Sequence, residues 1–270
     1  MKHILSLDLK FDIHSVKLLP TGITNQNYLV NNQFVLKVRQ PESDPFFSYA
    51  QERTIADIFY CHDLSPKYLM YNQQFHYSLS QFLPASHKGH GPLYANKEII
   101  QIAELITTYQ SFASPLLKPF NLEERYNFYR SKCANDFLLV IDEEKIIAEY
   151  NQTIDKSHLV LSHNDLVKNN FLFKGAKLYI IDFEFAGLND SMFDDASFIT
   201  ENHLSPAQEK LFLQTRYSNG YDHHKLDIFK KALNLLWCYW GYYMYQKTNR
   251  EIFLMIADEK KSLLTETFNH

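Results

Sequence analysis

The sequence predicts an α+β protein in which a small antiparallel-sheet part, residues 1–83, precedes a larger and mainly helical part, residues 84–270. In the first part, short apolar runs of strand type are separated by turn residues. In the second part, apolar residues recur mostly at helical spacing. The exception is residues 159–186, where two strand-like runs flank a polar loop.

Each element of the first part has its own signal. Strand-like alternation or apolar runs occur in five segments: residues 15–20, 26–30, 33–38, 67–71 and 75–83. A single helix is predicted in residues 46–64, where Ile55, Ile58 and Phe59 follow helical spacing. Asn72 begins a polar turn that joins the last two strands as a hairpin.

The second part is predicted to contain long helices in residues 95–112, 122–150 and 205–270. Ser205 and Pro206 make a favourable start for the last of these, since serine caps helices and proline suits the first helical position.

Composition excludes several classes of function. The chain has 270 residues, 46% of them hydrophobic, and a formal net charge of -4 without a basic stripe, so nucleic acid is not an expected partner. No run approaches the roughly 18 apolar residues of a membrane span, and the first twenty residues lack the apolar core of a signal peptide. Three widely spaced cysteines indicate buried, reduced thiols. A cytoplasmic protein is therefore predicted.

The polar loop and the run that follows it carry the chemistry. Asp165 stands five residues before Asn170, and Asp182 ends the apolar run LYII. Transfer of a phosphoryl group from a magnesium nucleotide needs one carboxylate beside the attacking hydroxyl, and an amide with a second carboxylate on the metal. The alternative is a polar surface turn, but the spacing H-x-D-x4-N followed by I-D-F-E favours the catalytic interpretation.

Four segments together resemble the choline kinase and aminoglycoside phosphotransferase superfamily, and most closely its bacterial LicA-type choline kinase branch. They are TGITNQNYLV, SHNDLVKNNFL, IDFEFAGLNDSMFDDASFITEN and WCYWGYYM, which occur in the expected order along the chain. The resemblance implies a two-lobed, protein-kinase-like fold, ATP and Mg²⁺ as cofactors, and a small cationic alcohol such as choline as substrate.

The resemblance also implies roles for individual residues. Asp165 would be the catalytic base, with Asn170 and Asp182 as metal ligands. Residues of the nucleotide site would be Thr24, Asn25, Asn27, Lys37, Glu52, Gln81, Phe82 and Leu83, the last three forming a hinge whose backbone binds adenine. Residues at the substrate would be Glu184, Glu201, Trp237 and Trp240, with Glu184 supporting either the metal or the substrate ammonium.

Two positions leave alternatives open. Thr21-Gly22 stands where the family often has two glycines, which suggests a stiffer phosphate loop. Glu42 competes with Glu52 as the ion-pair partner of Lys37, although the predicted helix favours Glu52. Asp194 is expected to hold the loop that follows the metal site.

The substrate is the least determined feature. Trp237 and Trp240 share a helix face, which is consistent with core packing as well as with an aromatic site for a quaternary ammonium. Ethanolamine, thiamine or an aminoglycoside would suit the same chemistry. A binding protein without turnover is the alternative from another class, although every expected catalytic residue type is present.

Overall fold

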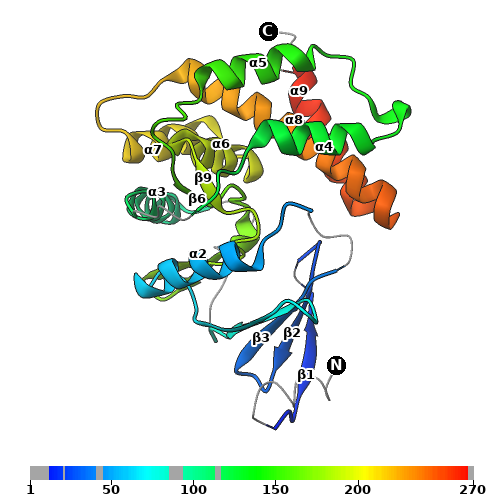
Figure 1. Cartoon of the computed structure of the whole chain (residues 1–270). Helices are drawn as coiled ribbons and strands as arrows, with labels where there is room; N and C mark the ends of the chain where they lie inside the picture. The colour runs from blue at the N-terminus through cyan, green and yellow to red at the C-terminus, as the bar shows by residue number, and fades with distance from the viewer. Residues whose placement is uncertain (1–11, 21, 41–44, 85–93, 113–116, 267–270) are drawn as a thin grey trace. The chain divides into compact units, whose positions relative to one another are not determined.

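The computed structural model describes residues 12–20, 22–40, 45–84, 94–112 and 117–266 (Figure 1). The chain divides into two compact units. The first comprises Met1–Lys88 with Asn169–Glu184, and the second comprises Gly89–Lys168 with Phe185–His270. The predicted boundary after residue 83 did not anticipate that residues 169–184 group with the first unit.

The first unit contains a five-stranded antiparallel sheet in the order β1-β2-β3-β5-β4. Its strands are β1 (Val16–Leu19), β2 (Gln26–Val30), β3 (Phe34–Val38), β4 (Tyr68–Asn72) and β5 (Tyr77–Gln81). Leu36 pairs with Leu79 on the face that forms the core, whereas its neighbour Lys37 pairs with Asn27 and Ser78 on the other face. This two-residue alternation presents the polar side chains away from the core.

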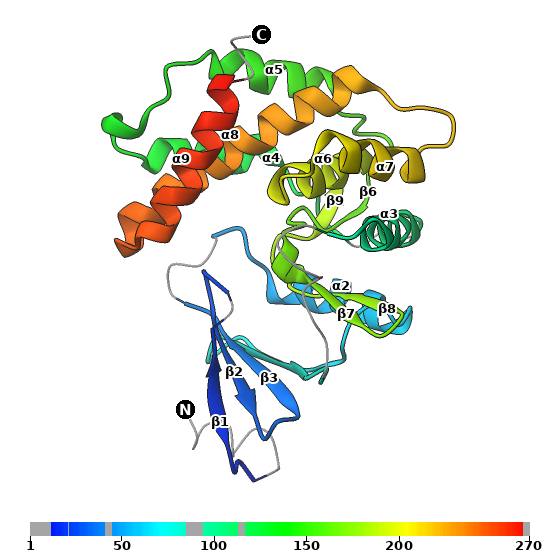
Figure 2. The same ribbon diagram turned by 180° about the vertical axis from the view of Figure 1, so that it is seen from behind.

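A helix and a hairpin complete the first unit. Helix α2 (Tyr49–Cys61) begins where Ser48 accepts a hydrogen bond from the Gln51 amide. The hairpin of β7 (Phe171–Lys174) and β8 (Lys177–Ile180) lies beside α2 in Figure 2. The Ile180 amide donates to the Leu64 carbonyl at 2.8 Å, which ties this late segment of the chain to the end of α2.

The second unit is mainly helical. Its helices are α3 (Asn96–Gln110), α4 (Leu122–Lys132), α5 (Glu143–Thr153), α6 (Ser191–Glu201), α7 (Pro206–Arg216), α8 (His223–Thr248) and α9 (Glu251–Glu266). Short strands β6 (Val160–Ser162) and β9 (Gly187–Asn189) pair antiparallel. The middle of α8 is buried on all sides because α4, α5, α6 and α9 pack around it (Figure 1).

Two long predicted helices are interrupted. Residues 122–150 form α4, a 3-10 turn η1 (Asn135–Phe137) and the start of α5, while residues 205–270 form α7, α8 and α9. The interruptions contain residues that cap helices. Asp142 and Asp222 cap new helices, and Asn249 ends α8 in the left-handed conformation. The sequence also failed to predict α6, whereas the predicted start of α7 at Ser205 and Pro206 is confirmed.

Two other findings bear on the composition. Cys61 is exposed, Cys133 is partly buried and Cys238 is buried, so the expectation of three buried thiols was wrong for the first. Within the described residues, no helix combines the length and apolar character that a membrane crossing requires.

Gly241 allows α8 and α9 to approach each other closely. A Cβ atom built at this position would lie 2.8 Å from the Phe253 carbonyl oxygen and 2.9 Å from Ala257 Cβ. Since real Cβ atoms do not approach backbone so closely, any side chain here must push the two helices apart.

We expect Gly241→Ala to lower the free energy of unfolding by about 1–3 kcal/mol, because the overpacking outweighs the gain in helix propensity. Urea denaturation measures this. Gly175→Ala is a poor comparison because its φ is +62°, so the matched control is an alanine substitution at the exposed helical residue Asp227. A neutral or stabilising Gly241→Ala would contradict the close approach.

Candidate active site

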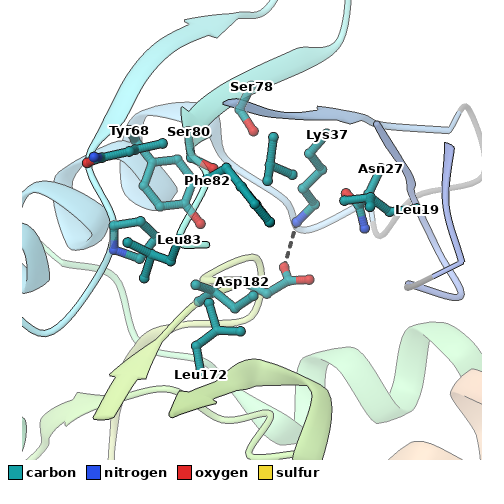
Figure 3. A pocket seen from close by; sticks show the side chains of 14 residues that line it. Leu19, Asn27, Lys37, Tyr68, Ser78, Ser80, Phe82, Leu83, Leu172 and Asp182 are labelled. Carbon is teal, nitrogen blue, oxygen red and sulfur yellow. Dashed lines mark hydrogen bonds and ion pairs between the residues drawn. The ribbon is translucent and has the colours of Figure 1, made fainter. Parts of the chain in front are cut away.

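Lys37 lies at the centre of a charged cluster in the first unit. Its Nζ atom is 2.5 Å from Asp182 Oδ1, 3.5 Å from Glu184 Oε2 and 3.6 Å from Glu52 Oε1. Figure 3 shows the Lys37 and Asp182 side chains pointing toward each other. The expected pairing of Lys37 with α2 is present through Glu52, whereas Glu42 lies outside the described residues.

Arg39 is a second buried cation, in the position directly after β3. Its guanidinium lies 3.0 Å from Glu184 Oε2 and 3.9 Å from Glu52 Oε2, and it stacks on the Phe47 ring with 3.2 Å to the centroid. Two cations therefore face three carboxylates, and the arginine fork reaches two of the three at once.

The cluster shifts the pKa values of its members. Burial acts to lower the pKa of Lys37, but attraction to Asp182, Glu184 and Glu52 outweighs it and raises that pKa well above its usual range. Burial likewise opposes the charge of Glu184, yet Lys37 and Arg39 lower its pKa to about 2. For Glu52, burial prevails over the same two cations and raises the pKa. Lys37 is thus charged at neutral pH, and so is Glu184.

A cavity of about 250 Å³ opens beside this cluster (Figure 3). Polar groups at one end are Asn27, Lys37 and Asp182, which come from β2, β3 and the residues after β8. The remaining wall is largely apolar and includes Leu19, Val35, Pro66, Tyr68, Phe82, Leu83, Leu172 and Ile181. A flat apolar group with a charged tail fits this combination of surfaces.

The predicted hinge lines the same cavity. Gln81, Phe82 and Leu83 all contribute to its wall. The Gln81 amide donates to the Lys67 carbonyl at 2.8 Å, and the Phe82 amide donates to the Gln33 carbonyl at 2.7 Å. These two amide groups are therefore used within the unit, and the backbone contact with adenine stays a prediction.

The predicted phosphate loop precedes β2. Both Thr24 and Asn25 donate hydrogen bonds to the Glu184 carboxylate. Thr24 Oγ1 lies 3.3 Å from Oε1, and Asn25 Nδ2 lies 2.9 Å from Oε2. Gly22 has φ +91°, and a Cβ atom there would meet Asn27 Nδ2 at 2.7 Å. The positive φ favours glycine at this turn, whereas the Asn27 side chain could move to make room for a Cβ atom.

The two predicted metal ligands lie at the open end of the β7–β8 hairpin. The Asn170 carbonyl accepts from the Ile181 amide at 2.9 Å, and Asp182 follows directly. Asp182 has φ +72°, a conformation that costs energy in a non-glycine residue and that recurs at functional sites. Amide and carboxylate oxygens are ligands that Mg²⁺ prefers, so this pair fits the predicted metal.

Asp165 belongs to the second unit, in the loop that follows β6. The backbone on both sides of it is bound by α6. Asp194 accepts the His163 amide at 2.9 Å and the Asn164 amide at 2.8 Å, while Ser197 Oγ accepts the Leu166 amide at 3.0 Å. Asp194 was expected to hold the loop after the metal site, and it instead holds the loop of the predicted base.

Asn164 adds a second fixation of this loop. It has φ +65° and is fully buried. Its side chain donates to the Phe185 carbonyl and accepts from Asn189, both at 2.9 Å. Such a backbone conformation persists only where the surroundings determine it, so the geometry next to Asp165 is strongly constrained.

Three of the four predicted substrate residues lie in the second unit, Glu201 on α6 and Trp237 and Trp240 on α8, whereas Glu184 belongs to the first unit. The Trp237 and Trp240 rings meet edge to face, with centroids 5.7 Å apart, and both are at least nine-tenths buried. Trp237 Nε1 has no hydrogen-bond partner among the described residues. Glu201 is 2.9 Å from the buried Lys260 of α9, so its charge already has a counter-ion.

Three residues that contribute to these sites were not found by sequence reasoning: Arg39, Asn164 and Ser197. Arg39 had a usable signal, because it follows Lys37 by two residues and an extended chain places such residues on the same side. Asn164 and Ser197 had none, since their partners are distant in the sequence.

The comparison with known proteins assigns the chain to a class. Residues 15–229 match the phosphotransferase enzyme family, so the chain belongs to this family. This confirms the predicted superfamily and the prediction of an enzyme that transfers a phosphoryl group to an alcohol.

Among individual proteins, the chain is 32% identical over 128 residues to Protein LicA of Haemophilus influenzae. The aligned segment covers 44% of this chain and 46% of that protein. The match thus spans about half the length of this relative. The crystal structure of the choline kinase LicA from Streptococcus pneumoniae is similar with a TM-score of 0.82 and 18% identity, over 98% of this chain and 97% of that one. A structure of LicA in complex with AMP gives a TM-score of 0.78 and 20% identity, over 98% and 96%. These likenesses confirm the protein-kinase-like α+β fold.

The hydrogen bonds of Asp194 lead to a prediction for stability. Its two oxygens accept three donors, of which the third is the Tyr109 hydroxyl at 2.6 Å. Asparagine offers one acceptor oxygen, so Asp194→Asn leaves a buried donor unpaired and should cost about 1–3 kcal/mol in urea denaturation at pH 7. The control Asp136→Asn, at an exposed position, should change it by less than about 0.5 kcal/mol.

The pH dependence gives a second measurement. Burial raises the pKa of Asp194 to about 6, against the opposing effect of its hydrogen bonds. Between the unfolded value of about 4 and this value the folded state binds the proton more tightly, so this group makes stability fall as pH rises. Asp194→Asn should remove that part of the slope. An unchanged slope would contradict the assignment.

Proposed function

We propose that this protein is an ATP- and Mg²⁺-dependent kinase that transfers the γ-phosphate of ATP to the hydroxyl of choline. The observation that carries the proposal is the position of Lys37. Its charged amine is held by Asp182 at the polar end of a cavity whose other wall is apolar. Membership of the phosphotransferase enzyme family supports it. Since the reaction consumes ATP, we place it in the cytoplasm.

The cavity accounts for nucleotide binding. An adenine ring is flat and largely apolar, and it would lie between Leu19, Val35 and Leu172 with the phosphates toward Lys37. There the Lys37 amine, released from Asp182, would bind the negatively charged phosphates. The Thr24 and Asn25 loop would cover the same phosphates.

The metal would be held by Asn170 and Asp182. When bound, Mg²⁺ neutralises charge on the phosphate oxygens and orients them for transfer. The two residues would supply only part of an octahedral coordination shell. This is usual for Mg²⁺, which keeps several waters and substrate phosphates as ligands.

In the transfer step, Asp165 accepts the proton of the choline hydroxyl. The hydroxyl oxygen forms a bond to the γ-phosphorus, the bond from that phosphorus to the bridging oxygen breaks, and ADP leaves with the bridging oxygen. The hydrogen bonds from the flanking backbone to α6 orient Asp165 before the reaction, so that little reorganisation is needed in the transition state.

Choline is proposed because the candidate substrate residues are aromatic. A quaternary ammonium cannot donate a hydrogen bond, and it is bound by aromatic faces such as those of Trp237 and Trp240. Buried tryptophan N–H groups usually have an acceptor, so the unpaired Trp237 Nε1 favours a ligand site over plain core packing. Glu201 then adds little net attraction, since Lys260 compensates its charge.

The role of Asp165 is tested by Asp165→Asn. We expect kcat to fall by about 100-fold or more because the proton acceptor is lost, while the KM for ATP stays the same. A coupled ADP-release assay with choline measures both. Asp227→Asn, at an exposed position of α8, is the control. Equal turnover of wild type and Asp165→Asn would exclude Asp165 as the base.

The aromatic site is tested by Trp240→Leu, which keeps an apolar side chain of considerable volume but removes the aromatic face. We expect the KM for choline to rise about tenfold, while the KM for ATP and that for ethanolamine change less. Phe253→Leu is the matched control, since Phe253 packs against Trp240 with centroids 5.5 Å apart. If both variants raise the KM for choline equally, or if ethanolamine is the better substrate of the wild type, the choline site is wrong.

A further inference from the structure

We propose that Glu184 and Arg39 are positioning residues that latch the phosphate loop, and that Glu184 does not contact the substrate ammonium. The inference rests on the proposed function only in taking Thr24 and Asn25 as the loop over the nucleotide phosphates. It replaces the expected role of Glu184 at the metal or the substrate with a structural one in nucleotide binding.

The contacts of Glu184 carry the first step. Its carboxylate accepts hydrogen bonds from Asn25 Nδ2 at 2.9 Å, from Thr24 Oγ1 at 3.3 Å and from Arg39 Nη1 at 3.0 Å. The residues that donate are distant in the sequence and come from the loop and from β3. One carboxylate therefore joins the loop before β2 to the third strand of the sheet.

The burial of Glu184 carries the second step. It is 9% exposed, and both carboxylate oxygens already have donors. Opening this site to an ammonium group would remove the hydrogen bonds that Asn25 and Arg39 donate to Glu184, and such a loss is costly for buried groups. Asp182, whose side chain is 28% exposed, differs in this respect and has the accessibility that a metal ligand needs.

Arg39 supplies the third step. A carboxylate as buried as Glu184 requires a compensating charge, and Lys37 is engaged mainly by Asp182. Arg39 provides that charge from a fixed position, because its guanidinium is stacked on Phe47. When Lys37 moves to the phosphates in the proposed reaction, Arg39 keeps Glu184 paired and the loop in place.

The experiment measures nucleotide binding without turnover. A non-hydrolysable ATP analogue is titrated into wild type, Glu184→Gln, Asn25→Ala and the double variant, in EDTA and in excess Mg²⁺. We expect each single variant to weaken binding about tenfold in both conditions, as for a lost charged hydrogen bond, and the double variant to be no worse. Amides of residues 22–26 should exchange hydrogen faster in each variant.

Two further variants sharpen the test. Arg39→Lys should retain part of the affinity that Arg39→Gln loses. Glu143→Gln is the matched control, since Glu143 is also a buried carboxylate paired with an arginine, 2.6 Å from Arg130 Nε, but in the second unit. It should lower stability without changing nucleotide affinity or the exchange of residues 22–26.

Three results would contradict the proposal that Glu184 and Arg39 hold the phosphate loop. They are a raised KM for choline with unchanged nucleotide affinity, a loss of affinity seen only with Mg²⁺, and additive effects of Glu184→Gln and Asn25→Ala. The first two would return Glu184 to the substrate or the metal. Because the binding and exchange measurements need no acceptor, they decide the latch even if choline proves not to be the substrate.

Discussion

Lys37 of β3 and Arg39, which directly follows that strand, lie near the same carboxylates, and these come from α2 and from the residues after β8. Buried charges are tolerated only in pairs, and loss of one partner from a buried pair typically costs about 3–5 kcal/mol. This one cluster joins three parts of the first unit to the sheet. They are α2, the segment after the β7–β8 hairpin and the predicted phosphate loop.

In the second unit, distant segments of the chain are held together by hydrogen bonds from backbone amides to the Asp194 carboxylate and the Ser197 hydroxyl. Helix α6 binds the backbone on both sides of Asp165, so the candidate base is oriented through its main chain and its carboxylate remains partly exposed. The left-handed residues Asn164 and Asp182 each lie next to, or at, a candidate functional position. In both places the fold holds the chain in a conformation that its sequence does not favour by itself.

These differences explain which parts of the protein could be predicted from the sequence. The sheet was predictable because alternation and turn residues are local signals, and Asp165, Asn170 and Asp182 could be proposed as site residues because the motif has a fixed spacing. The break between α7 and α8 was missed because helical spacing of apolar residues hides a short capping segment at Asp222. The partners of Glu184 were not predictable. A carboxylate that follows a strand can bind a loop, a metal or a substrate, and no local feature of the sequence shows which of these it binds. The residue types indicated the class of reaction, whereas the role of each carboxylate depends on its tertiary contacts.

The first unit is discontinuous, because residues 89–168 of the second unit separate its hairpin from its sheet in the sequence. During synthesis the sheet and α2 emerge before Asp182 and Glu184 exist, so Lys37 and Arg39 have only Glu52 from the eventual cluster. Domains that are contiguous in sequence can fold as they leave the ribosome, whereas this unit must wait for the intervening segment of the other. The arrangement makes the charged cluster and the cavity beside it a late product of folding, so a chain that ends before Asp182 cannot assemble them.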